Sequence, residues 1–420
     1  MSPRIELPDE SLVLLVGAAG SGKSTFAARH FTATQVVSSD RMRALIGDDP
    51  GDQSVTAAAF ELVHALVEKR LEHRRFTVVD ATNVEKRARE GLLRVAKSRH
   101  VRVDAVVLDV PIDVCIERDA ARERSVGEAV VREHHLYMGG IPRALDSEGF
   151  RAIHHLDGVD AIEGAEVARV PLANDLRHET GPFDVIGDVH GCAAELRDLL
   201  AALGYDEDGA HPEGRRVVFL GDLVDRGPSV VEVLKIAMRM MERHGALCVM
   251  GNHEAKLARA LEGRNVKIAH GLKASLDQLA REDTSFREAV RELIAAMPDH
   301  YRLDGGALVV AHAGLPERLH GRVSKKTWAH ALFGDTSGAT DAHGLPVRRD
   351  WGQHYRGDAV VIYGHTPTAD VRWVNETICI DTGCVFGGAL TAVRWPEREI
   401  VQVPARETYY VPAAMLSVER

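Results

Sequence analysis

Residues 12–25 read LVLLVGAAGSGKST, a short apolar run that leads directly into a glycine-rich loop. The loop matches G-x-x-x-x-G-K-[ST], and it follows a predicted strand and precedes a predicted helix, which is the context that this motif requires. Backbone N–H groups of such a loop point at phosphate oxygens, and the N-terminus of the helix adds a favourable dipole. The sequence therefore predicts a phosphate-binding loop, with nucleotide contacts from Gly17, Gly20, Ser21, Gly22, Lys23, Ser24 and Thr25.

Three side chains near this loop have the chemistry that a bound nucleoside triphosphate needs. Lys23 is expected to reach the β- and γ-phosphates, and Ser24 is expected to hold Mg²⁺ through its hydroxyl. Asp80 closes a predicted strand at 77–80 and is the candidate for a carboxylate behind the Mg²⁺, or else it caps the next helix. The expected cofactors of this half of the chain are ATP and Mg²⁺.

The strand predicted at 36–38 is followed by candidates for phosphoryl transfer to a hydroxyl group. Asp40 is the candidate general base, and Arg43 would share its helical face and hold a phosphate of the acceptor. Arg118 and Arg122 are spaced i, i+4 on a predicted lid helix, where arginines stabilise the charge of a transferring phosphoryl group. The alternatives are a helix N-cap for Asp40 and solvated surface positions for the three arginines.

The pattern of the whole chain predicts an α/β fold in two parts. The first 110 residues alternate short apolar runs with longer segments of helical period, as in βα units around a parallel sheet. Proline and glycine breakers then indicate a boundary, so we expect a domain at 1–170, a linker at 171–182 and a second domain at 183–420. In the second domain, apolar runs are followed at once by Gly, His or Asp clusters, which predicts one composite site at the carboxyl ends of its strands.

Five short motifs of the second domain contain metal-ligating residue types. They are DVH at 188–190, GDLVDRG at 221–227, GNHE at 251–254, AHAG at 311–314 and GHTP at 364–367. Carboxylate, amide and imidazole ligands without thiolates suit a pair of divalent ions such as Mn²⁺, Fe, Ni²⁺ or Zn²⁺, and Asp222 is the natural bridging carboxylate. The predicted metal ligands are Asp188, His190, Asp222, Asn252, His312 and His365.

Such a metal pair supports an in-line attack on phosphorus. It turns a bridging water into hydroxide near neutral pH and clamps the attacking and leaving oxygens. The leaving group then needs a proton, and His253 is the candidate donor, with Asp225 orienting its ring. Arg226 is the candidate cation for the phosphate.

Both motif sets resemble known families. The loop at 17–24, the Asp40-x-x-Arg43 element and the lid arginines resemble the 5′-hydroxyl polynucleotide kinases, in particular the kinase module of bacterial polynucleotide kinase-phosphatases that heal broken RNA ends. The second set resembles the binuclear metallophosphoesterases, in the branch of the serine/threonine phosphatases and diadenosine tetraphosphatases, which also includes the phosphatase module of the end-healing enzymes. In that module an aspartate after the last histidine motif contributes to activity. Asp381 matches it, although it could equally be a turn or cap residue.

The resemblance implies a P-loop kinase domain followed by a metallophosphoesterase domain that together heal RNA ends. ATP would phosphorylate 5′-hydroxyl ends, and a metal pair, with Mn²⁺ as the first expectation, would remove 2′,3′-cyclic, 2′- or 3′-phosphates. The implied partners are RNA ends, with DNA ends as the alternative, and a ligase or an RNA-modifying repair protein. Full-length members of that family continue into a ligase-like domain, whereas this chain ends at Arg420, so sealing is not expected. The sequence leaves the oligomeric state open, with a homodimer among the options.

Two other classes of function fit the same motifs. One is a protein Ser/Thr phosphatase or dinucleoside-polyphosphate phosphatase whose P-loop domain is a regulatory nucleotide sensor. The other is a non-catalytic scaffold. The intact Asp40-x-x-Arg43 element disfavours the first class, and the retention of every metal-ligand type disfavours the second.

Composition narrows the setting in which the protein works. The 420 residues carry 52 Lys and Arg against 62 Asp and Glu, a formal net charge of −10, so the chain is not a basic protein that coats long nucleic acids. Five cysteines are scattered without a CxxC pair, which fits reduced thiols in the cytoplasm. No apolar run approaches the roughly 18 residues of a membrane span, so no membrane association is expected.

Overall fold

The computed structural model describes residues 3–122, 124–340 and 346–411. The chain divides into two compact units. Unit 1 comprises residues 1–172 with 322–324, and unit 2 comprises residues 173–321 with 325–420. No described helix combines the length and the hydropathy needed to cross a bilayer.

A parallel five-stranded sheet forms the centre of unit 1. Its order is β3-β4-β2-β5-β6, and every pairing in it is parallel. The strands are β2 (Leu12–Val16), β3 (Val36–Ser38), β4 (Thr77–Asp80), β5 (Val103–Asp109) and β6 (Ala152–Asp157), while β1 (Arg4–Pro8) and β7 (Glu166–Val170) pair separately. All five side chains of β2 are buried, because the central strand of a parallel sheet is covered on both faces. The α/β prediction and the strand predicted at 77–80 are confirmed.

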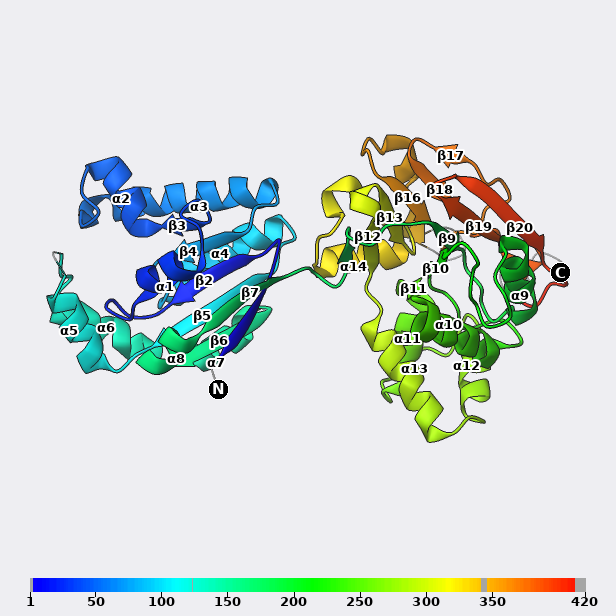
Figure 1. Ribbon diagram of the computed structural model, residues 1–420, viewed down its shortest axis with the longest axis horizontal. Coiled ribbons are helices and arrows are strands. Elements are labelled where there is room, and N and C mark those ends of the chain that lie inside the picture. Colours follow the sequence, from blue (N-terminus) through cyan, green and yellow to red (C-terminus); the bar gives the residue numbers. More distant parts are fainter. Residues whose placement is uncertain (1–2, 123, 341–345, 412–420) are drawn as a thin grey trace. The chain divides into compact units, whose positions relative to one another are not determined.

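Helices cover both faces of this sheet. Figure 1 shows α3 along one side of it and α7 along the other. The helices of unit 1 are α1 (Lys23–His30), α2 (Ser39–Gly47), α3 (Thr56–Glu72), α4 (Lys86–Ser98), α5 (Ile112–Ala120), α6 (Glu128–Met138), α7 (Ile141–Glu148) and α8 (Val159–Gly164).

One helix of unit 1 is shorter than predicted. The sequence places both Arg118 and Arg122 on the lid helix, but α5 ends at Ala120, so Arg118 lies on the helix and Arg122 lies beyond its end. The physical reason is Asp119, a buried carboxylate that accepts hydrogen bonds from the Ser125 hydroxyl at 2.6 Å and from the backbone N–H of Gly127 at 3.1 Å. These bonds turn the chain away from the helix axis. The predicted i, i+4 pair on one helical face is therefore wrong.

Unit 2 contains two larger sheets and a hairpin. The first sheet has the order β11-β10-β9-β19-β20 and the second β17-β18-β16-β13-β12-β8. The strands are β8 (Asp175–Leu176), β9 (Phe183–Ile186), β10 (Arg216–Phe219), β11 (Leu247–Cys248), β12 (His300–Leu303), β13 (Leu308–Ala311), β14 (Thr336–Thr340), β15 (Pro346–Arg348), β16 (Val360–Tyr363), β17 (Trp373–Val374), β18 (Thr377–Cys379), β19 (Ala389–Trp395) and β20 (Glu399–Pro404). Residues 175–176, within the segment expected as a linker, form β8 and pair with β12.

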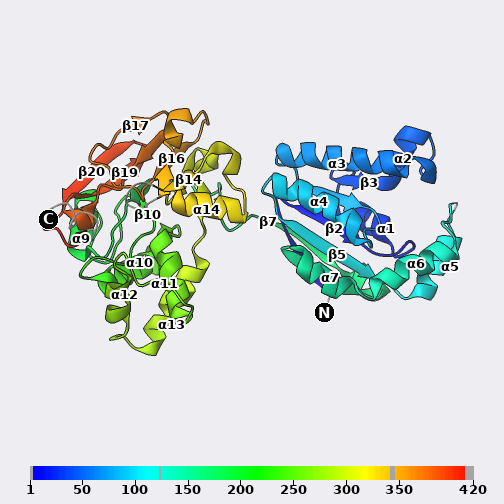
Figure 2. The same cartoon turned by 180° about the vertical axis from the view of Figure 1, so that it is seen from behind.

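Alternating side chains of β10 divide between two cores. Val218 packs between the sheets with residues such as Val310 and Val393, whereas Val217 and Phe219 face the core beneath the helices. This division follows from the two-residue period of a strand. The helices are α9 (Ala193–Leu203), α10 (Val230–His244), α11 (Asn252–Leu261), α12 (Leu272–Leu279), α13 (Thr284–Ala296) and α14 (Lys325–Phe333). Helices α10 to α13 gather on one side of the paired sheets in both views (Figures 1 and 2).

A buried ion pair in unit 1 provides a test of its packing. The Arg89 guanidinium donates to Glu148 at 2.6 Å, and the two side chains are 1% and 4% exposed. We expect Glu148→Ala to destabilise unit 1 by about 3 kcal/mol, because it leaves a buried guanidinium without its partner charge. All four tryptophans lie in unit 2. When Glu148→Ala is unfolded in urea, part of the circular-dichroism change should therefore occur at a lower urea concentration than in the wild type. The change in tryptophan fluorescence, which reports on unit 2, should stay at the same concentration.

The matched control is Glu128→Ala, which removes an exposed partner of Arg132 and should leave both transitions in place. Equal transitions for Glu148→Ala and the wild type would contradict the importance of the buried pair.

Candidate metal centre and phosphate-binding loop

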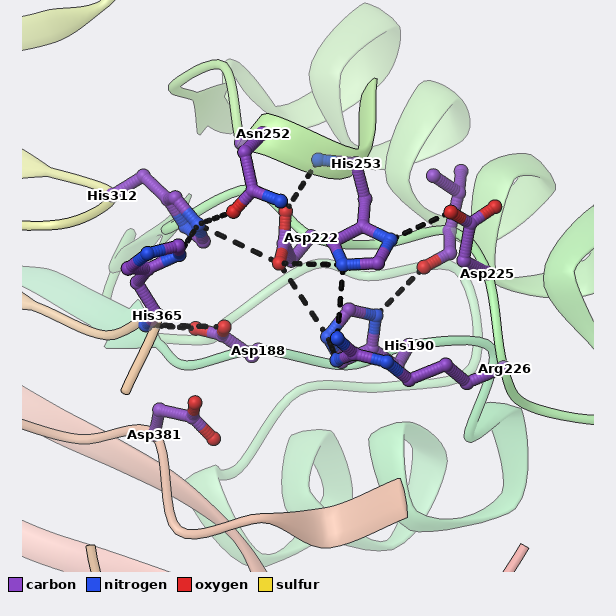
Figure 3. Close-up of polar contacts among 12 residues, drawn as sticks. Asp188, His190, Asp222, Asp225, Arg226, Asn252, His253, His312, His365 and Asp381 are labelled. Carbon is purple, nitrogen blue, oxygen red and sulfur yellow. Dashed lines mark hydrogen bonds and ion pairs between the residues drawn. The ribbon is translucent and has the colours of Figure 1, made fainter. Parts of the chain in front are cut away.

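The loops that follow β9, β10, β13 and β16, together with the first turn of α11, bring the predicted metal-site residues together (Figure 3). Several of these residues have a positive φ angle: His190 43°, Asp222 47°, Asp225 70°, Arg226 68° and His365 72°. Such a backbone conformation costs energy for residues other than glycine and is concentrated at functional sites. Each of these loops begins directly after a strand, and the pairing of that strand in its sheet fixes where the loop starts.

A first group of donor atoms consists of His190, Asp222 and His253, whose side-chain donors all lie within 4.8 Å of one another. The Nε2 atom of His190 is 3.4 Å from Oδ2 of Asp222, and Nε2 of His253 is 3.9 Å from the same oxygen. The Nδ1 atom of His190 donates to the carbonyl oxygen of Val224 at 2.7 Å. This hydrogen bond leaves the lone pair of Nε2 facing the group, as a metal ligand requires.

A second group consists of Asp222, His312 and His365. The Nδ1 atom of His312 donates to the carbonyl oxygen of Leu220 at 3.0 Å, so its Nε2 atom carries a lone pair. That Nε2 atom lies 3.0 Å from Oδ1 of Asn252, 3.0 Å from Nδ1 of His365 and 3.5 Å from Oδ2 of Asp222. The Nε2 lone pair of His312 therefore faces the amide oxygen of Asn252 and the carboxylate of Asp222 across short distances, an arrangement that fits a bound cation.

Asp222 belongs to both groups, which is the arrangement expected of a carboxylate that bridges two metal ions. Carboxylate, amide and imidazole donors without thiolates fit Mn²⁺, Fe, Ni²⁺ or Zn²⁺. Burial lowers the pKa of His312 to about 3, and burial with the charge of Arg226 lowers the pKa of His190 well below its usual value. Both rings are therefore neutral at physiological pH, the state in which imidazole binds metal.

The ring of His253 is held by a carboxylate on its far side. Its Nδ1 atom and Oδ2 of Asp225 are 2.6 Å apart, and Asp225 also accepts from the hydroxyl of Ser275 at 2.5 Å. Arg226 donates to Nε2 of His253 at 3.0 Å and contacts Nε2 of His190. The structure thus brings together the three residues expected to handle the leaving group and the phosphate, while the role of His253 as proton donor stays a prediction.

Asp188 and Asp381 lie beside the metal centre (Figure 3). Asp188 accepts from the backbone N–H of His365 at 3.1 Å, and Asp381 accepts from that of Gly383 at 3.0 Å. Burial, and then the charges of Asp381 and Asp222, raise the pKa of Asp188 well above its usual value, and burial raises the pKa of Asp381 to about 6. Among the described residues, neither carboxylate belongs to the two groups of converging donors. Their roles in metal binding and catalysis stay predictions.

Glu254 organises the loop of Asp222, a role that the sequence analysis did not assign. Its carboxylate accepts from the backbone N–H of Asp222 at 2.7 Å, of Leu223 at 2.8 Å and of Gly251 at 3.1 Å. The side chain is fully buried, and burial raises its pKa to about 7. Its place in the GNHE motif was visible in the sequence, but Asp222 and Leu223 lie 32 and 31 residues earlier, and only the fold brings them close.

Arg348 is a second residue that the sequence analysis missed. It ends β15 and donates to Nε2 of His365 at 2.6 Å. Because Arg226 contacts the first group of donors, each group has a guanidinium beside it. No motif surrounds Arg348 in the sequence, so only the tertiary structure identifies it.

The predicted phosphate-binding loop of unit 1 connects β2 to α1. The ammonium group of Lys23 donates to the carbonyl oxygens of Gly17 at 2.9 Å and Ala18 at 2.8 Å, which folds the side chain over its own loop. The hydroxyl of Ser24 is hydrogen-bonded to Asp80, whose pKa is nevertheless raised by burial. Gly20 has φ +82°, and a Cβ there would lie 2.2 Å from the carbonyl oxygen of Cys115.

The candidates for phosphoryl transfer lie around this loop. Asp40 forms an ion pair with Arg43, and Arg43 also donates to the carbonyl oxygen of Pro50 at 2.8 Å. The N-cap of α2 is Ser38, and the side chain of Arg43 is only 11% exposed, so neither of the simpler alternatives for this pair holds. The negative charge of Asp40 favours the protonated form of both Lys23 and Asp80.

The lid arginines lie close to the same loop. Nη1 of Arg118 is 3.6 Å from the position that a Cβ on Gly22 would occupy. The positive charge of Arg122 favours the deprotonated form of both Lys23 and Asp80. Ser24 and Thr25 are exposed in the first turn of α1, whereas Ser21 is buried. Contacts of these residues with a nucleotide stay predictions.

Each unit matches a family of known proteins over part of its length. Residues 12–139 match the AAA domain family, and residues 181–369 match the calcineurin-like phosphoesterase family. Over 234 residues the chain is 45% identical to the Bis(5′-nucleosyl)-tetraphosphatase PrpE [asymmetrical] of Geobacillus sp. (strain WCH70), covering 54% of this chain and 96% of the relative. The PrpE protein of Anoxybacillus flavithermus (strain DSM 21510 / WK1) is 43% identical over the same length, with the same coverage.

The paired sheets and the two groups of donors that share Asp222 define a binuclear metallophosphoesterase. The chain belongs to the calcineurin-like phosphoesterase family, preceded by a P-loop domain of the AAA type. The expectation of an α/β P-loop domain followed by a metallophosphoesterase is thereby confirmed. The names of these two relatives do not mention RNA end healing.

The position of Glu254 leads to a prediction about metal affinity. In Glu254→Gln an amide N–H₂ group competes for space with the backbone N–H donors that hold the loop of Asp222, so the bridging carboxylate loses its fixed position. We expect Mn²⁺ affinity to fall about 10- to 100-fold, as for other residues that orient metal ligands. Competition with a chelating dye measures this change. Glu242→Gln, at an exposed position of α10, is the control, and equal affinities of both variants would contradict the prediction.

The environment of Lys23 leads to a prediction about protons. Burial lowers the pKa of this ammonium to about 8, so much of it is neutral near pH 8.5. Phosphates beside it favour the charged form, and binding of Mg·ATP should therefore take up protons near pH 8.5 but far fewer near pH 7, where Lys23 is already charged. Calorimetry in buffers of different ionisation enthalpy measures the uptake. Lys86→Met, at an exposed position, should leave it unchanged, and equal uptake at both pH values would contradict the assignment.

Proposed function

We propose that unit 2 hydrolyses dinucleoside polyphosphates, cleaving a phosphoanhydride bond at the metal centre. The observation that carries this proposal is the 45% identity to a Bis(5′-nucleosyl)-tetraphosphatase across 96% of that relative's length. The arrangement of the arginines supports it. Arg226 lies beside His190 and His253, and Arg348 lies beside His365, so a polyphosphate chain across the centre meets a guanidinium on each side.

Different residues of the centre can take different roles in hydrolysis. Bound metal ions would supply a nucleophilic hydroxide at neutral pH and hold the attacking and leaving oxygens. His253, held through Nδ1 by Asp225, is the candidate donor of a proton to the leaving phosphate oxygen. Its Nε2 atom accepts from Arg226, and burial and the charge of Arg226 lower its pKa well below the usual value, so the ring has to take up a proton as the charge of the substrate arrives. Arg226 and Arg348 offset the negative charge that the substrate brings into a centre already rich in carboxylates. The metals would be held by His190, Asp222, Asn252, His312 and His365, with Asp188 beside them.

Diadenosine tetraphosphate with Mn²⁺ tests the proposal. We expect asymmetric cleavage to ATP and AMP, separated by ion-exchange chromatography, and loss of turnover in Asp222→Asn because the bridging carboxylate is lost. Lys23→Ala, in the other unit, should retain full turnover. Release of no nucleotide from this substrate, with removal of phosphate from a 3′-phosphorylated RNA oligonucleotide instead, would reject the proposal.

A second candidate is the healing of RNA ends, which one feature of unit 1 favours. The Asp40–Arg43 pair lies next to the phosphate-binding loop, and the side chain of Asp40 is 65% exposed, so its carboxylate is open to a hydroxyl acceptor. A unit that only senses a nucleotide does not need an accessible carboxylate there. In this reading ATP and Mg²⁺ bind unit 1, a 5′-hydroxyl RNA or DNA end is the acceptor, unit 2 removes the phosphate of the other end, and a separate ligase seals the product.

An RNA oligonucleotide with a 5′-hydroxyl and a 2′,3′-cyclic phosphate tests this candidate. Labelled γ-phosphate of ATP should reach the 5′ end, and Asp40→Asn should lower the transfer at least about 100-fold, as expected for loss of a general base. Asp222→Asn should spare it. ATP binding with no transfer to the oligonucleotide would instead leave unit 1 as a nucleotide-binding domain.

A further inference from the structure

A cavity of about 900 Å³ opens beside the metal centre within unit 2. It is lined by residues of α11, α13 and α14 and by the segment that follows α11. Asn252 lines the cavity, and Oδ1 of the same residue faces His312 at 3.0 Å in the metal centre. The cavity and the metal centre therefore share a wall, and the volume is within the range of small-molecule sites.

Two aromatic side chains of α14 line one side of this cavity. Trp328 and Phe333 are 40% and 41% exposed, although large aromatic residues are usually covered. Their ring centroids are 5.8 Å apart, with the planes inclined at 73°. An exposed indole next to a second ring is a surface on which a planar base can stack.

Unpaired cations line the same cavity. Arg259, Lys267 and Arg291 line it, and none of them forms an ion pair with another described residue. Carboxylates are present too, since Glu288 and Glu292 come from α13. Guanidinium and ammonium groups suit phosphates, and carboxylates accept hydrogen bonds from amino and hydroxyl groups. A ligand with phosphates, hydroxyls and a planar base uses the cationic, acidic and aromatic groups of the wall.

We propose that this cavity binds one nucleoside of the dinucleoside polyphosphate, with its base stacked on Trp328 and its phosphate chain leading past Asn252 to the metal centre. The inference rests on the proposed hydrolysis of these compounds and adds the part of the site that selects them. A metal centre by itself acts on any phosphate that reaches it. The cavity supplies contacts that a substrate without a base cannot make.

Substrate selectivity provides the first test. In Trp328→Ala we expect kcat/KM for diadenosine tetraphosphate to fall about 10- to 100-fold, mainly through KM, and that for inorganic tripolyphosphate to stay within about twofold. Trp328→Phe should retain most of the activity, because a phenyl ring still stacks. Trp373→Phe, outside the cavity, is the control. An equal loss on both substrates, or no loss on either, would overturn the inference.

A binding measurement separates this inference from the proposed function. With Mn²⁺ present, AMP should quench tryptophan fluorescence in the wild type and much less in Trp328→Phe, whereas ribose 5-phosphate should quench neither. If diadenosine tetraphosphate is not hydrolysed but this quenching is seen, the proposed function fails and the base site stands. If hydrolysis occurs and AMP quenches both proteins equally, the base site fails alone. Quenching by a 3′-phosphorylated RNA oligonucleotide but not by AMP would overturn the choice of ligand.

Discussion

The carboxylate of Asp222 lies between two sets of imidazole nitrogens, and much of unit 2 holds it there. The residue is buried at φ 47°, its backbone N–H donates to Glu254, and its Oδ1 accepts from the backbone N–H of His253 at 3.0 Å. Burial of a carboxylate is costly unless a cation or hydrogen bonds compensate for it. Gly221 allows this approach, because a Cβ there would lie 2.4 Å from the backbone nitrogen of Gly251. With Oδ1 held in this way, Oδ2 lies close to both groups of donors, and the binuclear centre depends on its position.

Both units place their candidate site residues where strands end. In unit 1 the carbonyl groups of the loop after β2 accept hydrogen bonds from Lys23. In unit 2 the loops after β9, β10, β13 and β16 supply candidate metal ligands. Parallel strands carry their carboxyl ends to one edge, so residues far apart in the chain meet there. The units differ in the groups that can compensate the negative charge of a phosphate. Unit 1 offers lysine and arginine side chains, whereas unit 2 has donor sets that fit metal ions, with arginines beside them.

The strand ends were predictable because their signal is local. Apolar runs at 77–80, 103–109 and 183–186 stand in the sequence as short hydrophobic segments next to glycine or polar clusters, and they are strands in the structure. The end of α5 was not predictable, since Asp119 stops the helix by bonding to residues that follow it. Strands β19 and β20 also escaped notice, because their pairing with β9 and with each other is a long-range property.

The sequence by itself determined the two domain types, the phosphate-binding loop and the types of metal-ligating residue, because glycine positions and strand-end motifs are read within a few residues. Only the tertiary structure decided which donors share Asp222, that Glu254 holds its loop, that Arg348 reaches His365 and that Trp328 borders a cavity beside Asn252. These are distances between side chains on separate elements. They depend on how strands pair and helices pack, and no local pattern encodes them.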